Sequence, residues 1–470
     1  MKKRFGLILT LIAVIFMNFA ACNNNNKEAN DLLSTPSPQP QLVTIDAPQK
    51  EADTAKNSDN NSDDMKGNGA ADPTLTPALV EADEDIFNRK DEEYITMIEN
   101  SLISTGNNYR VKKAIEKAQK GEKVTIAYIG GSITEGAGAT TSEGCYAYQS
   151  YLYFKDTFGS GDGGNVKFVN TGMGGTPSTL GIIRYDRDVT DYGQVQPDIV
   201  FIEFAVNDYQ EPTNGEAYES LIRKVLSAEN QPAVILLFSV FKSRWNMQDL
   251  YKPIGSAYNL PMISIKDAVV PELEAGQITD SEFFIDDYHP TDFGHGIMAD
   301  CVKYYYSTVN AEPTAVKDIT VPKAAYLGKS FEGIKMIDSK TVDENVFITP
   351  GSFIQNDDQL CKFATKQLTF PNNWKHGSLS GSDSFVMKLN CRNLLFVYKS
   401  CSDEAFGTAD IYVDGKLATN LVSSQSGGWN NPVPVLLLKE DKAADHTVEI
   451  TMAEGNEDKE FTILAFGYTQ

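Results

Sequence analysis

Residues 124–134 read VTIAYIGGSIT. The first six are apolar or β-branched, which is typical of a buried strand. Two glycines then permit a sharp turn, and Ser132 follows at its tip. A serine hydroxyl is a weak nucleophile that needs a general base and an oxyanion site to react. A serine after two glycines is also common in ordinary loops. A catalytic role for Ser132 therefore requires a general base and oxyanion donors from other parts of the chain.

Short apolar runs recur downstream and alternate with helical patterns. The expected strands are residues 124–129, 166–169, 198–204, 233–240 and 262–265. The expected helices are residues 91–103, 109–120, 145–158, 215–228, 246–258 and 293–307. This alternation predicts a parallel sheet covered by helices on both faces. Such sheets bind ligands beyond the carboxyl ends of their strands.

Three further segments follow expected strands and carry reactive or donor groups. Residues 170–175 (NTGMGG) allow the backbone to approach a reacting group and direct an N–H at it. Asn207 carries an amide that can donate a hydrogen bond to a developing oxyanion. Asp286 precedes His289 by three residues, so its carboxylate can hold one ring nitrogen while the other accepts the serine proton.

Several of these residues have alternatives. Asp287 rivals Asp286, although the three-residue spacing favours Asp286. Asn207 is also typical of a helix cap or a turn. Asn170 is expected to brace the glycine loop rather than to react. Three residues near the segment ends suit either substrate contact or a structural role and are left out of the candidate site: Arg184, Glu203 and Tyr209.

The four segments resemble, in order and content, the SGNH (GDSL-like) hydrolase superfamily. The resemblance covers roughly residues 108–308 and includes the run HPTDFGH at residues 289–295. It implies a flavodoxin-like three-layer α/β/α domain with a parallel sheet. Two departures stand out. Gly131 replaces the usual aspartate of the first block, and Ala205 replaces the usual glycine of the third. Both resemble a bacterial branch of the superfamily.

The resemblance also implies roles for the candidate residues. Ser132 would be the nucleophile and would donate its own backbone N–H to the oxyanion. Gly175 would supply a second backbone N–H, and Asn207 a side-chain donor. His289 would act as general base and then as acid, oriented by Asp286. The implied reaction is ester hydrolysis through an acyl-enzyme, with neither a cofactor nor a metal.

Residues 320–470 have a different sequence pattern from the preceding residues. Short alternating segments at 384–389, 394–398, 446–452 and 461–466 read as strands, and an Asp-Gly pair at 414–415 predicts a hairpin turn. The pattern predicts an all-β sandwich, jelly-roll-like, that would serve as a carbohydrate-binding-like accessory domain. Trp374 and Trp429 would either stack on sugar rings or belong to the core.

The N-terminus predicts export. Residues 1–22 combine a basic start, a short apolar core and small residues before Cys22, which resembles the lipobox of bacterial lipoproteins. Cys22 would then carry lipid on the outer side of the cytoplasmic membrane; a plain secretory signal is the alternative. Polar residues 23–85 would form a disordered tether. The catalytic domain is expected at residues 86–312.

The amino-acid composition limits the classes of partner that the protein is expected to bind. The formal net charge of −23 argues against nucleic acid and against a polybasic membrane contact, so the lipid anchor would be the sole membrane link. The chain has six cysteines and no CxxC pair, so no zinc ribbon is indicated. Cys145 is expected to be a buried thiol, whereas a bridge between Cys391 and Cys401 stays open. The oligomeric state stays open as well.

Secreted enzymes of this superfamily with an attached β domain resemble carbohydrate O-deacetylases. An acylated carbohydrate, such as acetylated xylan or mannan, is therefore the expected substrate. Three alternatives remain: a surface glycan-binding lipoprotein with an inactive α/β domain, a lipase or thioesterase, and an acyltransferase. The last shares the acyl-enzyme with hydrolysis and cannot be separated from it by sequence.

Overall fold

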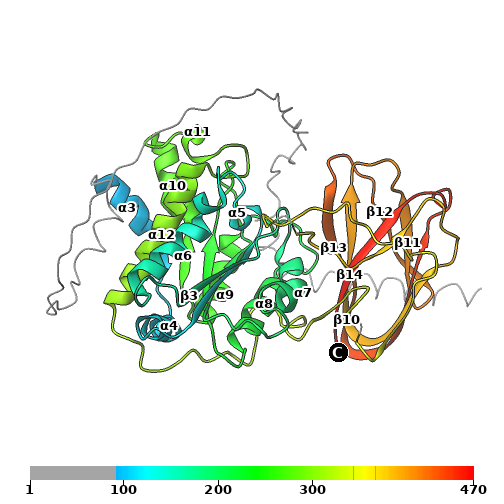
Figure 1. Ribbon diagram of the computed structural model, residues 1–470, viewed down its shortest axis with the longest axis horizontal. Helices are drawn as coiled ribbons and strands as arrows, with labels where there is room; N and C mark the ends of the chain where they lie inside the picture. Colours follow the sequence, from blue (N-terminus) through cyan, green and yellow to red (C-terminus); the bar gives the residue numbers. More distant parts are fainter. Residues whose placement is uncertain (1–91, 342, 366) are drawn as a thin grey trace, which may run out of the picture. The chain divides into compact units, whose positions relative to one another are not determined.

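The computed structural model describes residues 92–341, 343–365 and 367–470 (Figure 1). All of them fall in one compact unit of the chain. The expected signal segment, Cys22 and the tether lie outside the described residues. Within the described part, no helix is both long and apolar enough to cross a membrane.

A six-stranded sheet forms the centre of the first region, in the order β1-β6-β5-β4-β2-β3. Its strands are β1 (Leu102–Ser104), β2 (Val124–Gly130), β3 (Val166–Asn170), β4 (Ile199–Glu203), β5 (Ala233–Phe238) and β6 (Met262–Ser264). All neighbours pair in parallel except β1, which runs antiparallel to β6. Every residue of β2, β4 and β5 is buried, as expected for strands covered on both faces.

Helices cover both faces of this sheet (Figure 1). One face packs against α3 (Glu92–Asn100), α4 (Tyr109–Gln119), α6 (Tyr146–Phe158), α10 (Ile265–Ala275) and α12 (Asp292–Ala311). The other packs against α7 (Ser178–Asp188), α8 (Glu216–Leu226) and α9 (Gln248–Ala257). Short helical turns complete the region: α5 (Ser132–Glu135), η1 (Ser142–Gly144) and α11 (Asp280–Phe283). The predicted three-layer α/β/α class is confirmed.

The prediction of a helix over residues 91–103 is wrong at the carboxyl end of the helix. The helix α3 ends at Asn100, and residues 102–104 form the edge strand β1 instead. Leu102 pairs with Ile263 of β6, so a partner distant in sequence takes these residues out of the helix. The helices α7 and α10 were not expected at all.

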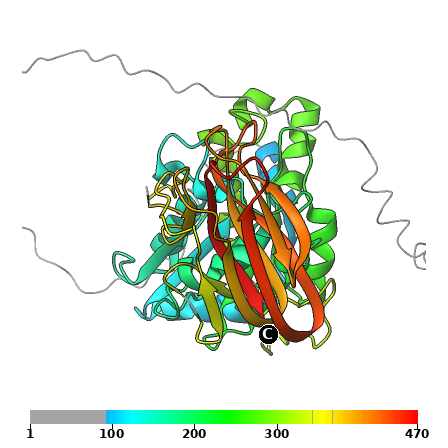
Figure 2. The same ribbon diagram turned by 90° about the vertical axis from the view of Figure 1, so that its right-hand side faces the viewer.

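The second region consists of strands that pair antiparallel throughout (Figure 2). The main path runs β12-β11-β13-β10-β14-β7, with β8 beside β10 and β9 beside β14. The strands are β7 (Lys335–Ile337), β8 (Val346–Thr349), β9 (Trp374–His376), β10 (Phe385–Cys401), β11 (Thr408–Val413), β12 (Lys416–Val422), β13 (Trp429–Met452) and β14 (Phe461–Thr469).

The predicted hairpin between β11 and β12 is present. Asp414 and Gly415 both have positive φ, 52° and 73°, as a type I′ turn requires. The segments 384–389 and 394–398 are not two strands, however. They form the single strand β10, which pairs with β8 near its start and with β14 further along. A register shift between Cys391 and Asn393 in its pairing with β13 accommodates the change of partner.

Candidate active site

Ser132 begins the short helix α5, directly after strand β2. The two preceding residues have to be glycines because other side chains approach them closely. A Cβ on Gly130 would lie 2.3 Å from Thr134 Oγ1, and a Cβ on Gly131 would lie 2.1 Å from Asn207 Oδ1. The absence of side chains at these two positions therefore lets the turn fold tightly and presents the Ser132 hydroxyl at the carboxyl end of the sheet.

His289 lies next to Ser132 although 157 residues separate them in sequence. His289 Nε2 is 2.9 Å from Ser132 Oγ, and His289 Nδ1 is 2.8 Å from Asp286 Oδ2. The other carboxylate oxygen of Asp286 accepts the backbone N–H groups of Tyr288 and His289, at 2.7 and 2.8 Å. A hydroxyl, an imidazole and a carboxylate thus form a continuous hydrogen-bonded chain, the arrangement that activates a serine.

The environment of Asp286 favours its ionised form. Partial burial raises the pKa of this carboxyl, but the hydrogen bond from His289 and those from the backbone N–H groups outweigh burial and hold the pKa below its ordinary value. Asp287 points elsewhere: its side chain is largely exposed and lies 3.7 Å from Lys242 Nζ. The geometry therefore places Asp286, and not Asp287, beside the histidine.

The glycine-rich loop after β3 lies against the serine turn. Asn170 braces it, because its Nδ2 donates to Thr134 O at 2.7 Å and its Oδ1 accepts the N–H of Gly172 at 2.9 Å. Gly174 N donates to Glu135 Oε2 at 2.8 Å. Gly175 follows with a φ of +63°, a conformation that favours glycine. The loop is thereby fixed next to Ser132.

Asn207 follows the end of β4, and its side chain packs against Gly131. The Oδ1 atom is buried and has no hydrogen-bond partner among the described residues. The amide therefore stands beside the serine turn, and none of the described residues donates a hydrogen bond to its oxygen. The structure thus brings together all five sequence-predicted residues: Ser132, Gly175, Asn207, Asp286 and His289.

Two supporting residues were not predicted as part of the site. Arg184, on α7, is 0% exposed and donates to Thr171 O at 2.6 Å and to Gly130 O at 3.3 Å, which ties the two loops together. Glu135 holds Gly174, as described above. The sequence left Arg184 between substrate contact and a structural role and gave no role to Glu135, because both roles arise from how the loops meet.

Glu203 and Tyr209 differ in placement. Glu203 is 0% exposed and accepts a hydrogen bond from Thr134 Oγ1 at 3.0 Å. Burial raises its pKa to about 7. Tyr209 is exposed and packs edge-on against Trp245, with the ring centroids 5.4 Å apart. Glu203 is therefore a buried support behind the turn.

The two tryptophans singled out in the sequence have separate environments. Trp374 is 7% exposed and packs against Phe385 in the core of the β region. Trp429 is 46% exposed, and a Cβ on Gly175 would lie 2.8 Å from its Cζ2 atom. An aromatic side chain from the second region therefore stands directly on the glycine loop.

The remaining candidates are not reactive. Cys145 is buried, and burial raises the pKa of its thiol to about 11. Cys391 and Cys401 are both free thiols. His295 is buried on α12, and its ring bonds to backbone atoms of Tyr146 and Ala137. In the described part of the chain, no three His, Cys, Asp or Glu side chains are grouped to hold a metal ion.

Comparison with protein families finds one match. Residues 128–297, which contain Ser132, Gly175, Asn207, Asp286 and His289, match the GDSL-like Lipase/Acylhydrolase family. A comparison with curated proteins finds no match.

Two similar solved structures cover most of the chain. One is a two-domain esterase (CEX) active on acetylated mannans, with 30% identity and a TM-score of 0.69; the match covers 79% of this chain and 99% of that one. The other is the same esterase co-crystallised with mannopentaose, again with 30% identity over 79% and 99% of the two chains and a TM-score of 0.68. The similarity therefore extends over both regions of the fold.

Proposed function

Since this chain belongs to the GDSL-like lipase/acylhydrolase family and is an SGNH-type ester hydrolase, we propose that it removes O-acyl groups, chiefly O-acetyl, from carbohydrate. The observation that carries the proposal is the hydrogen-bonded chain from Ser132 through His289 to Asp286. A second observation, the exposed Trp429 beside the glycine loop, supports a saccharide as the alcohol part of the ester.

The first half of the reaction forms an acyl-enzyme. Ser132 Oγ bonds to the acyl carbon while its proton passes to His289 Nε2. The bond between the acyl carbon and the sugar oxygen then breaks, and His289 returns the proton to that oxygen. Ionised Asp286 keeps the proton of Nδ1 on the side away from the serine and stabilises the imidazolium.

The second half regenerates the serine. A water molecule gives a proton to His289 and attacks the acyl carbon. When the bond to Ser132 Oγ breaks, His289 protonates the serine, and the carboxylic acid leaves. In both halves the negative oxygen would be stabilised by the N–H groups of Ser132 and Gly175 and by the amide of Asn207.

The surroundings of the nucleophile support a short acyl group. A Cβ on Gly174 would lie 3.8 Å from Ser132 Cβ and 3.5 Å from Trp429 Cη2. The indole is therefore close to the serine and limits the space on that side. A long fatty acyl chain would need a broad apolar groove, so the nearby indole favours a small acyl group such as acetyl.

The test compares the full chain with its Ser132→Ala variant on four substrates: acetylated mannan, acetylated xylan, p-nitrophenyl acetate and p-nitrophenyl palmitate. We expect acetate release from a glycan and from the acetate ester, abolished by Ser132→Ala, with little release of palmitate. Ser142→Ala, at an exposed serine in η1, is the matched control and should leave the activity unchanged. Folded protein that releases only palmitate, or nothing, would contradict the proposal.

We also propose that the protein is anchored outside the cytoplasmic membrane through lipid on Cys22. The support is the sequence of residues 1–22. Labelling of cells with a radioactive fatty acid should mark the wild-type chain and not a Cys22→Ser variant. Label that persists in the variant would contradict the anchor.

A further inference from the structure

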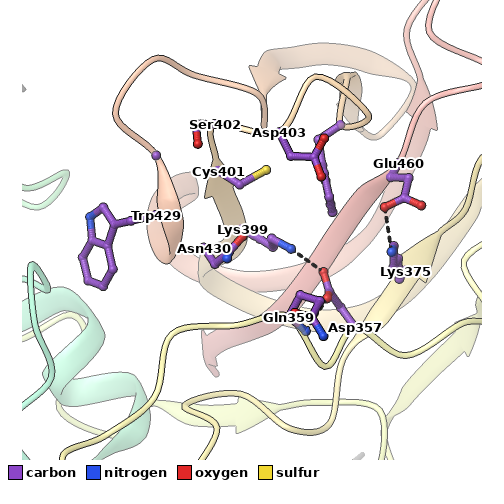
Figure 3. Close-up of a pocket in the computed structure, with 12 residues that line it drawn as sticks. Asp357, Gln359, Lys375, Lys399, Cys401, Ser402, Asp403, Trp429, Asn430 and Glu460 are labelled. Carbon is purple, nitrogen blue, oxygen red and sulfur yellow. Dashed lines mark hydrogen bonds and ion pairs between the residues drawn. The ribbon is translucent and has the colours of Figure 1, made fainter. Parts of the chain in front are cut away.

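A pocket of about 280 Å³ lies in the β region, next to Trp429 (Figure 3). Its lining comes from five places in the chain: the loop after β8, strand β9, the end of β10 with the following loop, the start of β13, and the residue before β14. Glu460, just before β14, closes one side. The volume is near the lower end of small-molecule sites, which is about 300 Å³, and suits a single ring-sized ligand.

The floor of the pocket is a fully buried ion pair. Lys399 Nζ lies 2.9 Å from Asp357 Oδ2, and each side chain is 1% exposed. Thr462 Oγ1 also donates to Asp357, at 2.7 Å, and Lys399 Nζ lies 4.1 Å from the centre of the Phe406 ring. A buried pair with so many partners is a rigid polar floor.

A second ion pair stands in the wall. Lys375 Nζ lies 2.7 Å from Glu460 Oε2, and both side chains are partly exposed. Figure 3 shows the two pairs side by side, with Gln359 and Asp403 at the edge of the same space. Each lining lysine is thus neutralised by a carboxylate, so the pocket offers no free positive charge to an anion. Paired donors and acceptors suit neutral hydroxyl groups instead.

Trp429 connects this pocket to the catalytic site. Its backbone belongs to the pocket lining, while its indole is turned away from the ion pairs in Figure 3 and contacts Gly175. The neighbouring backbone is fixed, because Cys361 N donates to Asn430 O at 3.0 Å and Trp429 N donates to Asn431 Oδ1 at 3.1 Å. One residue therefore forms the boundary between the nucleophile and the pocket.

We propose that this pocket is a saccharide subsite for a neutral glycosyl residue of the same chain whose acyl group is held at Ser132. The inference rests on the proposed function, since it assumes a carbohydrate ester. One sugar ring would stack on the indole of Trp429, and a neighbouring ring would hydrogen-bond to the Lys375–Glu460 pair. The β region would then select glycan chains directly and not only support the catalytic region.

The test measures binding of unacetylated manno- and xylo-oligosaccharides to the full chain carrying Ser132→Ala, by calorimetry. This binding needs no acyl chemistry, so its result is independent of whether the wild type releases acetate. Adding Lys375→Met or Trp429→Ala should weaken binding about tenfold or more, the loss expected when a hydrogen-bonded or stacked ring is given up. Lys335→Met breaks an exposed ion pair elsewhere in the β region and should leave the affinity unchanged.

Further variants separate contact from damage to the fold. Trp429→Phe keeps an aromatic face and should recover part of the affinity lost in Trp429→Ala. Longer oligosaccharides should bind more tightly than disaccharides, and this gain should disappear in Lys375→Met. Matching thermal midpoints would show that each variant is folded.

Three results would overturn the subsite. Folded protein that binds none of the oligosaccharides excludes it. Unchanged affinity in Lys375→Met, with loss only in Trp429→Ala, would restrict binding to the indole and leave the pocket unused. Stronger binding of oligogalacturonate than of neutral oligosaccharides would contradict the inferred neutrality of the ligand.

Discussion

The side chain of Asn207 occupies the space that a side chain at position 131 would need. A Cβ at position 131 would lie 2.1 Å from Oδ1 of Asn207 and 2.6 Å from its Nδ2. Real Cβ atoms do not approach so closely, so a larger residue at 131 would displace the amide. At the scale of one residue, the serine turn of this chain therefore requires glycine at position 131.

The conflict yields a prediction. Gly131→Ala should lower kcat on p-nitrophenyl acetate by about 100-fold or more, as Asn207→Ala should, because each removes or displaces the proposed oxyanion donor. The double variant should lose little beyond either single one, since the two effects share one cause. Gly296→Ala is the control, because a Cβ there meets nothing within 4 Å. Near-normal turnover in Gly131→Ala would contradict the argument.

Glu203 makes stability depend on pH. Burial raises its pKa from 4.5 to about 7, so the folded protein binds a proton there that the unfolded chain releases. The contribution is complete below pH 4.5 and is lost as pH rises to about 7. We expect the free energy of unfolding, measured in urea, to fall less between pH 5 and 8 in Glu203→Gln than in the wild type. An identical fall in both proteins would show that Glu203 stays ionised when folded.

The candidate catalytic residues and the bracing Asn170 could be predicted from the sequence, but the supporting roles of Glu135 and Arg184 could not. Ser132 comes right after strand β2, whose apolar pattern is clear, whereas Asp286 and His289 do not follow a strand as expected but lie between α11 and α12, in a motif with fixed spacing. Glu135 and Arg184 are ordinary helix residues by pattern. They acquire their roles only because the turn after β2 and the loop after β3 meet in the folded chain.

At the scale of elements, helix α7 holds the two loops of the site together. Arg184 projects from it between the ends of β2 and β3, where it donates to backbone carbonyl groups of both connections. Asp188, one turn further along, lies 3.3 Å from the same guanidinium. The start of the helix is fixed as well, since Ser178 N donates to Asp208 Oδ1 at 2.6 Å.

Removal of this guanidinium should be costly. Arg184→Met removes the donor to Thr171 O, whereas Gly130 O keeps the N–H of Met173 and Asp188 keeps Arg187, so we expect a loss of about 2 kcal/mol or more in the free energy of unfolding. Arg184→Lys should recover only part of it, because one ammonium cannot reach both carbonyls. Lys155→Met breaks an exposed pair with Asp156 and should cost less than about 1 kcal/mol. Equal losses in Arg184→Met and Lys155→Met would refute the bracing role.

The sequence predicted the central strands well and some helices poorly. Strands β2, β4 and β5 are continuous apolar runs, and this pattern indicates a buried strand. Helix α7 contains Gly181, which lowers its helix propensity. That glycine is needed because a Cβ there would lie 2.6 Å from the Phe204 ring. Strand β10 was divided in two because its change of partner from β8 to β14 is a tertiary feature.

At the scale of the whole molecule, the α/β region and the β region share one apolar core. Leu395, Val397 and Leu464 of the β strands belong to the same buried cluster as the residues of α7 and α8. Gly467 allows a close approach, since a Cβ there would lie 2.7 Å from Ile183 Cγ1. Lys439 also pairs with Glu216 of α8. Separation of the two regions would expose this apolar surface to water.

The shared core predicts that both regions unfold together. The chain has three tryptophans, so two variants can each retain one reporter: Trp245 for the α/β region and Trp374 for the β core. Fluorescence of the two should change at the same urea concentration, because loss of either region removes part of the other's core. Ile183→Asp places a charge in that core and should lower both midpoints equally, whereas Lys335→Met should shift neither. Two separate transitions in the proteins with Ile183 would show that the regions are stable independently. A shift of only one midpoint in Ile183→Asp would show the same. In either case, Trp429 would reach the glycine loop without a common core behind it.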